Sequence, residues 1–201
     1  MIGKWNKSVI LTYVGLILST LGITFVIANV DIKYVMICLM LSGICDLFDG
    51  TVARKCKRTK EEKEFGIELD SLVDVMSFIA LPIAILSTIN KSFIYLPITL
   101  IYAVFAVARL AYFNIKTADS EKAIKSYIGL PVTYAALIFP LVFLLFHLLK
   151  ENTFIILYNI INLIVAILFI LKIKVPKPKL VSSIILLLIA IIVTIIYLFV
   201  V

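Results

Sequence analysis

Charged residues are scarce in this sequence. They make up 15% of its 201 residues, whereas 63% are hydrophobic, and the mean hydropathy is +1.18. A soluble core of this size does not need so much apolar surface. The composition therefore excludes an ordinary water-soluble domain and indicates a membrane protein.

Cysteine and histidine are also rare. The three cysteines, Cys38, Cys45 and Cys56, show no CxxC spacing, and His147 is the single histidine. This scarcity argues against a disulfide framework and against a zinc site, because both need thiolate or imidazole groups at defined spacings. We expect the cysteines to be reduced packing residues and His147 to be a structural or interfacial side chain.

Long apolar runs, in contrast, fill most of the chain. Seven of them approach the length of about twenty residues that a helix needs to cross a bilayer. They cover approximately residues 8–28, 33–53, 67–88, 92–114, 128–149, 153–172 and 180–200. The sequence predicts an all-α polytopic membrane bundle, with residues 1–200 as a single integral membrane domain, because no connecting loop is long enough to fold alone.

Lysine and arginine are distributed unevenly between the two ends of these spans. If the N-terminus is cytoplasmic, fifteen of them lie on the cytoplasmic side and three, Lys33, Lys91 and Lys150, lie outside. The positive-inside rule therefore predicts a cytoplasmic N-terminus. Topology and anionic headgroups also account for the net charge of +7, so we expect membrane lipids and no nucleic acid as partners. The fifteen are Lys4, Lys7, Arg54, Lys55, Lys57, Arg58, Lys60, Lys63, Lys116, Lys122, Lys125, Lys172, Lys174, Lys177 and Lys179.

The last apolar run is set apart from the others. The prolines and lysines of VPKPK, residues 175–179, interrupt the helical pattern, because proline cannot continue a helix interior. The span over about 180–200 then carries no charged side chain. We expect it to face lipid while it packs against the bundle or against a second protomer.

Four aspartates lie at the adjoining ends of the second and third runs, where the spans meet the cytoplasm. Asp46 and Asp49 are three residues apart and Asp70 and Asp74 are four apart, so each pair occupies one face of a helix. Carboxylates are costly in a membrane, and four unneutralised ones would repel one another. We therefore predict that the two faces meet around bound cations.

Hard divalent cations fit this set of side chains. Mg²⁺ and Mn²⁺ prefer oxygen ligands, and no histidine or cysteine is placed to favour zinc. Magnesium keeps part of its coordination shell for substrate phosphates, and two ions about 4 Å apart can clamp a pyrophosphate. The aspartates thus predict two divalent ions and phosphate chemistry at the cytoplasmic side.

Small residues accompany the first pair of aspartates. Gly50 and Ala53 continue the same helical face and leave a shallow trough. One interpretation is that a flat nucleotide base or a diphosphate approaches the backbone there, and the other is that a second helix packs closely against it. Arg54 follows directly, and its planar guanidinium group can reach phosphate oxygens.

Together these residues resemble the signature of the CDP-alcohol phosphatidyltransferase family. The pattern D-x-x-D-G-x-x-A-R followed by G-x-x-x-D-x-x-x-D is matched at all eight defining positions within residues 46–74. One departure is the gap of eleven residues between Arg54 and Gly66, which is longer than in the common form. We expect the extra residues to lie in the polar loop and to leave the helical faces intact.

The resemblance implies a six-helix core, here with one or more extra C-terminal helices, in which the four aspartates bind two divalent ions. It implies a CDP-lipid substrate, CDP-diacylglycerol or an ether-lipid analogue, whose diphosphate sits on these ions. Asp74 would also be the general base that deprotonates the acceptor hydroxyl. Gly50, Ala53, Arg54 and Gly66 would border the cytidine and the phosphates, and a homodimer is expected.

Further motifs are similar to those of the phosphatidylserine synthase branch of this family. They are EFGIELDSLVDVMSFIALP at 64–82, RLAYFN at 109–114 and YIGLP at 127–131. The branch implies L-serine as acceptor, so that transfer of the phosphatidyl group, or its ether-lipid equivalent, gives phosphatidylserine and CMP.

Arg109 offers a physical argument for serine. It is the single lysine or arginine within the fourth run, and a charge inside a membrane is usually functional. We predict that it holds the serine carboxylate in a bidentate pair, with Asn114 or Tyr112 contacting polar atoms nearby. The alternative is that Arg109 pairs with an aspartate or reaches the surface, and Tyr127 is expected to be a packing residue.

Two other functions stay open from the sequence. The same chemistry could use inositol, inositol phosphate or glycerol phosphate as acceptor. An acceptor that carries a phosphate would, however, need several fixed cationic side chains in its binding site. The chain has only three arginines, while Lys116, Lys122 and Lys125 could compensate. A cation-coupled transporter is less favoured, because the acids gather at one side instead of continuing across the bilayer.

Overall fold

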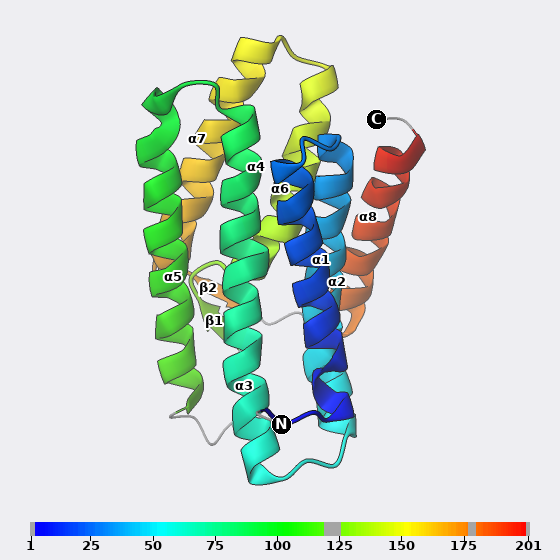
Figure 1. The fold of residues 1–201 in the computed structure, drawn as a ribbon. Coiled ribbons are helices and arrows are strands. Elements are labelled where there is room, and N and C mark those ends of the chain that lie inside the picture. The colour runs from blue at the N-terminus through cyan, green and yellow to red at the C-terminus, as the bar shows by residue number, and fades with distance from the viewer. Residues whose placement is uncertain (1–2, 119–125, 177–179, 200–201) are drawn as a thin grey trace.

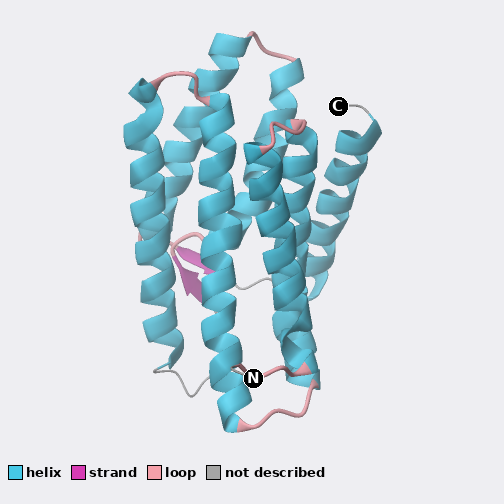
Figure 2. Cartoon of the chain, viewed as in Figure 1, coloured by secondary structure: helices cyan, strands magenta, loops and turns pink. Residues whose placement is uncertain are grey.

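The computed structural model describes residues 3–118, 126–176 and 180–199, which form a bundle of long helices that run up and down (Figure 1). The α-helices are α1 (Ile10–Ile27), α2 (Ile32–Lys55), α3 (Lys60–Val75), α4 (Leu81–Ile89), α5 (Leu96–Ala118), α6 (Ala135–Phe143), α7 (Glu151–Ile170) and α8 (Leu180–Phe199). Short 3-10 turns cover Lys7–Val9, Phe93–Tyr95, Val132–Tyr134 and Leu144–His147, and Met76–Ala80 is π-helical. Two short antiparallel strands, β1 (Ser126–Ile128) and β2 (Lys174–Pro176), pair Tyr127 with Val175 (Figure 2).

The predicted all-α membrane bundle is confirmed. Within the described ranges, six helical stretches are long and apolar enough to cross a membrane: Lys7–Ile27, Ile32–Lys55, Lys60–Ile89, Phe93–Lys116, Glu151–Ile170 and Val181–Phe199. The fifth expected span, 128–149, corresponds instead to a shorter apolar helix over Val132–His147. It is shorter because Ile128 belongs to β1, residues 129–131 are not helical, and the helical stretch ends at His147.

The ends of the bundle match the distribution of basic residues. The α1–α2, α4–α5 and α6–α7 connections lie at the end opposite the N-terminus (Figure 1). Lys91 and Lys150 lie in two of these connections and Lys33 lies in the first turn of α2, at the same end. Lys91 forms an ion pair with Glu151, the first residue of α7. Four of the fifteen basic residues predicted at the N-terminal end, Lys122, Lys125, Lys177 and Lys179, lie outside the described residues.

The start of α3 corrects the expectation for the gap between Arg54 and Gly66. A capping box, in which the Thr59 side chain accepts from the Glu62 N–H and Glu62 accepts from the Thr59 N–H, begins α3 at Lys60. Six residues of the gap, 60–65, are therefore helical, and only 56–59 form the connection. The longer gap extends α3 instead of enlarging a loop, and both helical faces are intact.

Helices α3 and α4 form one rod of 30 residues, Lys60–Ile89, with the π-helical turn near its middle. Pro82 has no N–H and cannot donate to the Phe78 carbonyl four residues before it. Tyr102 of α5 is fully buried, and its hydroxyl donates to this carbonyl at an oxygen–oxygen distance of 2.6 Å. Tyr102 therefore replaces the missing donor and fastens α5 to the segment that directly follows Asp74.

Changing Tyr102 to phenylalanine should lower the free energy of unfolding by about 1–2 kcal/mol, because the buried Phe78 carbonyl then loses its donor. Thermal unfolding of the purified protein in detergent measures this loss. Tyr34→Phe is the matched control, since Tyr34 is 43% exposed. Equal midpoints for the Tyr102→Phe variant and the wild type would show that the hydrogen bond does not stabilise the bundle.

Helix α1 lies closely along α2 because its inward face is made of small side chains. A Cβ atom at Gly22 would lie 3.1 Å from the Cβ of Cys38, and one at Gly15 would lie 3.4 Å from the Cβ of Cys45. Small residues let membrane helices approach in this way. The three cysteines are free, as expected from their spacing, and Cys38 and Cys45 are buried. His147 is exposed in the turn after α6, at the end opposite the N-terminus.

Candidate active site

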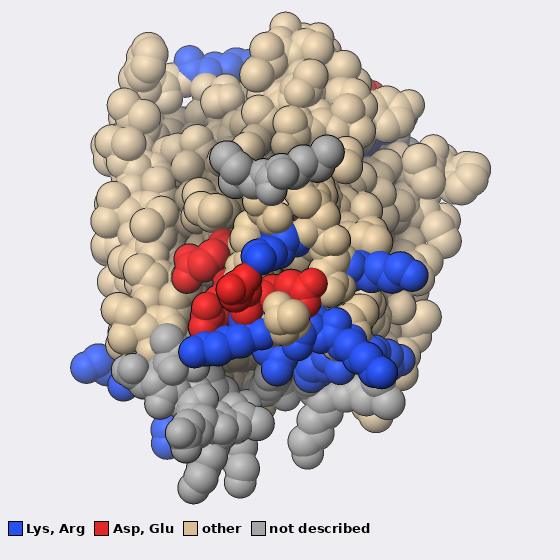
Figure 3. Space-filling model, turned by 60° about the horizontal axis from the view of Figure 1, so that its bottom comes forward, with Lys and Arg blue, Asp and Glu red and all other residues tan. Residues whose placement is uncertain are grey.

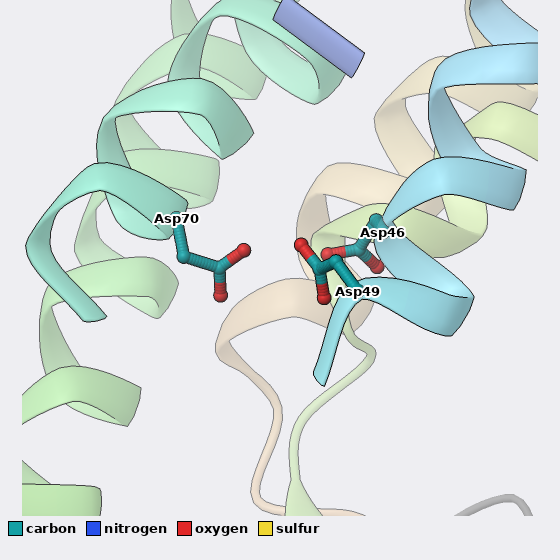
Figure 4. Close-up of side chains that lie close together, drawn as sticks. All are labelled: Asp46, Asp49 and Asp70. Carbon is teal, nitrogen blue, oxygen red and sulfur yellow. The ribbon is translucent and has the colours of Figure 1, made fainter. Parts of the chain in front are cut away.

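The two pairs of aspartates meet across the gap between α2 and α3. Asp70 on α3 points toward Asp46 and Asp49 on α2 (Figure 4). Each of the three offers one carboxylate oxygen, and these oxygens lie within 4.8 Å of one another. This convergence is the arrangement that the spacing of the sequence predicts, and an all-oxygen donor set of this kind suits a hard divalent cation.

Asp74 lies beside this group but is not a member of it. The Asp74 carboxyl group is within hydrogen-bonding reach of Asp46. In the same way, the Asp70 carboxyl group is within hydrogen-bonding reach of Asp49. Asp74 and Asp70 are both on the inner face of α3 and line one cavity. The three-oxygen group and the neighbouring fourth carboxyl therefore occupy distinct positions in the same site.

The aspartates open into a cavity of about 400 Å³. Its polar part contains four carboxylates and two guanidinium groups among the described residues that line it, which leaves an excess of two negative charges. In Figure 3 the acidic side chains gather in an opening that lysine and arginine side chains border. The polar lining comprises Asp46, Asp49, Asp70, Asp74, Arg54, Arg109, Thr51, Thr133, Tyr127, Tyr134 and Ser183.

The rest of the cavity wall is mainly apolar, and three helices supply much of it. Helix α2 supplies Met40, Ile44 and Leu47, α6 supplies Leu137, and α8 supplies Leu186 and Leu187. The final span thus packs against the bundle, one of the two arrangements expected for it, and in addition forms part of the cavity wall. Apart from Ser183, the residues that α8 contributes to the described lining are aliphatic, so its sequence does not distinguish that wall from a lipid-facing surface.

The small residues and Arg54 occupy different places. Gly50 lines the cavity, and a Cβ atom there would lie 3.5 Å from Nη1 of Arg54. Arg54 is exposed at the rim, where its Nη2 donates to the Thr51 hydroxyl at 2.9 Å. Ala53 and Gly66 are not among the described residues that line the cavity. A Cβ atom at Gly66 would instead face Val9 at 3.7 Å.

Arg109 is 5% exposed and forms part of the cavity wall. Its Nε–H donates to the Leu130 carbonyl at 3.1 Å, and its guanidinium carbon lies 4.9 Å from the centroid of the Phe113 ring. Within the described part of the chain it forms no ion pair with an aspartate, and its Nη groups form no hydrogen bond. The side chain is thus held at Nε while its planar fork remains available for an anion.

The YIGLP segment holds Arg109 through a backbone that requires glycine. Gly129 has a φ of +78°, and a Cβ atom there would lie 2.4 Å from the Phe169 carbonyl oxygen. The Gly129 N–H donates to Ile173, and the next N–H, of Leu130, donates to Leu168. These contacts dock the segment on the end of α7 and aim the Leu130 carbonyl at Arg109.

Tyr127 and Asn114 occupy different positions relative to the cavity. Tyr127, expected to be a packing residue, lines the cavity, and its ring centroid lies 6.0 Å from the Arg109 guanidinium carbon. Burial, and then the nearby Asp46 carboxylate, raise the pKa of the Tyr127 hydroxyl, so it stays a protonated donor. Asn114 donates to the Ser71 hydroxyl at 2.8 Å and, with Tyr112, is not among the described residues of the cavity wall.

Comparison with known proteins agrees with the geometry of the site. The model of the family described as CDP-alcohol phosphatidyltransferase matches residues 5–200. A CDP-diacylglycerol–serine O-phosphatidyltransferase of Helicobacter pylori is 36% identical over 141 residues, which cover 66% of this chain and 57% of that protein. The enzyme of the same name from Methanocaldococcus jannaschii is 34% identical over 139 residues, 69% of this chain and 62% of the relative.

A third relative differs in the name of its lipid product. An archaetidylserine synthase of Methanothermobacter thermautotrophicus is 33% identical over 102 residues, which cover 50% of this chain and 42% of that protein. The matched segments therefore span less than two thirds of the length of each of these relatives.

Proposed function

Because the chain belongs to the CDP-alcohol phosphatidyltransferase family, we propose that this integral membrane protein is a metal-dependent CDP-diacylglycerol–serine O-phosphatidyltransferase, or acts in the same way on an ether-linked CDP-lipid. The observation that carries the proposal is the convergence of Asp46, Asp49 and Asp70, with Asp74 beside them, in a cavity that is acidic at one side and apolar at the other.

The donor set fits Mg²⁺ or Mn²⁺. Asp46, Asp49 and Asp70 would hold the first ion, and Asp74 lies close enough to Asp46 to share in a second. Divalent ions bound there supply charge neutralisation of the diphosphate and stabilisation of the departing phosphate. The excess of two negative charges among the described cavity residues supports this assignment.

The apolar part of the cavity fits the lipid half of the substrate. Its apolar walls include residues of α2 and α8, which are long and apolar enough to cross a membrane, and of the shorter α6. A diphosphate at the aspartates can thus remain joined to tails that lie among apolar side chains. Arg54 at the rim is placed for phosphate oxygens, and Gly50 allows a close approach to α2.

The Asp74 carboxylate would accept the proton of the serine hydroxyl. The serine oxygen then forms a bond to the lipid-side phosphorus, while the bond from this phosphorus to the bridging oxygen breaks. CMP leaves with the bridging oxygen, and phosphatidylserine remains. Positioning of both substrates in one cavity contributes to the rate, because it replaces an encounter in solution by a reaction between bound groups.

Arg109 would bind the serine carboxylate through its Nη groups, with the Tyr127 hydroxyl as a second donor in the same wall. The Leu130 carbonyl and the Phe113 ring already fix the plane of the guanidinium group. A fixed fork suits bidentate recognition of a carboxylate. Asn114, Ala53 and Gly66 stay predictions as binding residues, since the cavity as described does not reach them.

Arg109→Lys should raise the KM for serine by about tenfold or more and change kcat less, because an ammonium group cannot reproduce the bidentate pair. Initial rates of CMP release at varied serine concentration measure both constants. Arg58→Lys is the matched control, since Arg58 lies in the α2–α3 connection and outside the cavity. An unchanged KM for serine in Arg109→Lys would contradict the carboxylate contact.

The orientation and the partners follow from the same proposal. The active site would lie at the cytoplasmic side, together with the N-terminus, because most basic residues gather at that end. The partners would be the CDP-lipid, L-serine and membrane lipids, and the protein would form a homodimer.

One experiment tests the function. The purified protein is incubated with Mn²⁺ or Mg²⁺, with CDP-diacylglycerol or its ether-linked analogue, and with L-serine, inositol, inositol phosphate or glycerol phosphate in turn. We expect CMP release only with serine, and phosphatidylserine or its ether analogue as the product by mass spectrometry. Release with another acceptor alone would overturn the serine assignment, and no release with any acceptor would overturn the transferase.

A further inference from the structure

Helix α1 carries no aspartate, yet it borders the carboxylate site. Its buried residues are Thr12, Gly15, Ser19 and Gly22, all small and all on one face. This face lies against α2 and against the rod formed by α3 and α4. Two of the four residues are hydroxyl side chains in an apolar helix, so we asked what each one contacts.

The Thr12 hydroxyl donates to Oδ2 of Asp49 at 3.1 Å. Both side chains are buried, with 6% of Thr12 and 8% of Asp49 exposed. A small pocket beside the carboxylates is lined by Thr12 together with all four aspartates. Thr12 lines this small pocket and is not among the described residues of the large cavity, so its hydroxyl contacts Asp49 outside that cavity and restricts the rotation of the carboxylate.

The second hydroxyl holds α1 in the register that this contact needs. Ser19 lies two helical turns after Thr12, and its hydroxyl forms a hydrogen bond with that of Ser77. Ser77 follows Asp74 by three residues and lies in the π-helical turn that Tyr102 fastens from the other side. α1 is thus bonded both to the aspartate helix α2 and to the rod that carries the other two aspartates.

We propose that Thr12 is a positioning residue for the divalent-cation site: its hydroxyl orients the Asp49 carboxylate toward the oxygens of Asp46 and Asp70. The inference rests on the proposed function only in that the aspartates bind a divalent cation. Outer hydrogen bonds of this kind fix the orientation of ligating carboxylates, and their loss costs about 10- to 100-fold in metal affinity.

Binding of Mn²⁺ to the purified full-length protein, followed by the electron paramagnetic resonance signal of free Mn²⁺, tests the inference. Thr12→Val keeps the volume and removes the hydroxyl, and we expect it to raise the Kd for Mn²⁺ by about 10- to 100-fold. Thr12→Ser keeps the hydroxyl and should bind as the wild type does. Thr24→Val is the matched control, because the Thr24 hydroxyl is exposed and donates to the Thr20 carbonyl of its own helix.

Kinetics add a readout that a general loss of stability would not produce. In Thr12→Val the apparent KM for Mn²⁺ in CMP release should rise in parallel with Kd. At saturating Mn²⁺, kcat should stay within about a few fold of the wild-type value, because the Asp49 ligand is misoriented but still present. Thermal unfolding without metal compares the folding of each variant. Should Thr12→Val not fold, Thr12→Ala provides a second variant without the hydroxyl.

Wild-type Mn²⁺ affinity in a folded hydroxyl-free variant would overturn the role of Thr12. Equal weakening in Thr12→Ser and Thr12→Val would also overturn it, because the methyl group and not the hydroxyl would then be responsible. A wild-type protein that binds Mn²⁺ but releases no CMP would refute the proposed function and leave the inference on Thr12 standing. A wild-type protein that does not bind Mn²⁺ overturns both.

Discussion

Asp74→Asn should lower kcat for phosphatidyl transfer by about 10²- to 10⁴-fold, the range that a positioned general base contributes. The amide keeps the size of the carboxyl but cannot accept the proton of the serine hydroxyl. The three-oxygen group of Asp46, Asp49 and Asp70 does not include Asp74, so the variant should still bind a divalent cation. CMP release under saturating substrates measures kcat, and the Mn²⁺ resonance assay measures binding.

The matched control for this prediction is Glu68→Gln, an equivalent loss of charge at an exposed position of the same helix. Its turnover should equal that of the wild type. If Asp74→Asn stays folded and retains near-normal turnover, the general-base role is wrong. If it loses Mn²⁺ binding together with activity, Asp74 acts mainly as a ligand, as the family resemblance also implies.

Removal of divalent ions by a chelator should lower the rate of CMP release by about 100-fold or more, because metal ions contribute several kcal/mol to stabilisation of charge in the transition state. Addition of Mg²⁺ or Mn²⁺ in excess of the chelator should restore the rate. The physical reason lies in the site itself, where four carboxylates face two guanidinium groups among the described cavity residues. Without a cation, a diphosphate there would meet like charge.

Asp70→Asn links this prediction to the structure. The variant loses one of the three oxygens that lie within 4.8 Å of one another, so it should require a higher Mn²⁺ concentration for half-maximal rate. Phosphatidyl transfer that continues at the wild-type rate in excess chelator would contradict the metal requirement. A normal Mn²⁺ requirement in Asp70→Asn would instead remove Asp70 from the ligand set.

Much of the fold and of the carboxylate site could be predicted from the sequence. Apolar runs near twenty residues require helices in a bilayer, because each backbone polar group must be satisfied within its own segment. The helical period then places Asp46 and Asp49 on one face and Asp70 and Asp74 on another. These two regularities are local, so they can be recognised without knowledge of the tertiary structure.

The period of a helix does not determine which neighbour its face meets. Ala53 and Gly66 share the predicted faces, yet neither is among the described residues that line the cavity, although Ala53 directly precedes Arg54 and Gly66 lies one helical turn before Asp70. Asn114 lies five residues after Arg109, on a different part of α5, and donates to Ser71. Contact of both residues with one acceptor therefore stays a prediction.

What the sequence by itself determined was the membrane bundle and the four aspartates on two helical faces, since composition and period are properties of single segments. Only the tertiary structure decided that Thr12 of α1 reaches Asp49, that the Leu130 carbonyl holds Arg109, and that α8 closes the apolar wall. Each of these contacts joins residues distant in the chain, and each depends on how far one helix is rotated and shifted against another, which packing of whole helices sets.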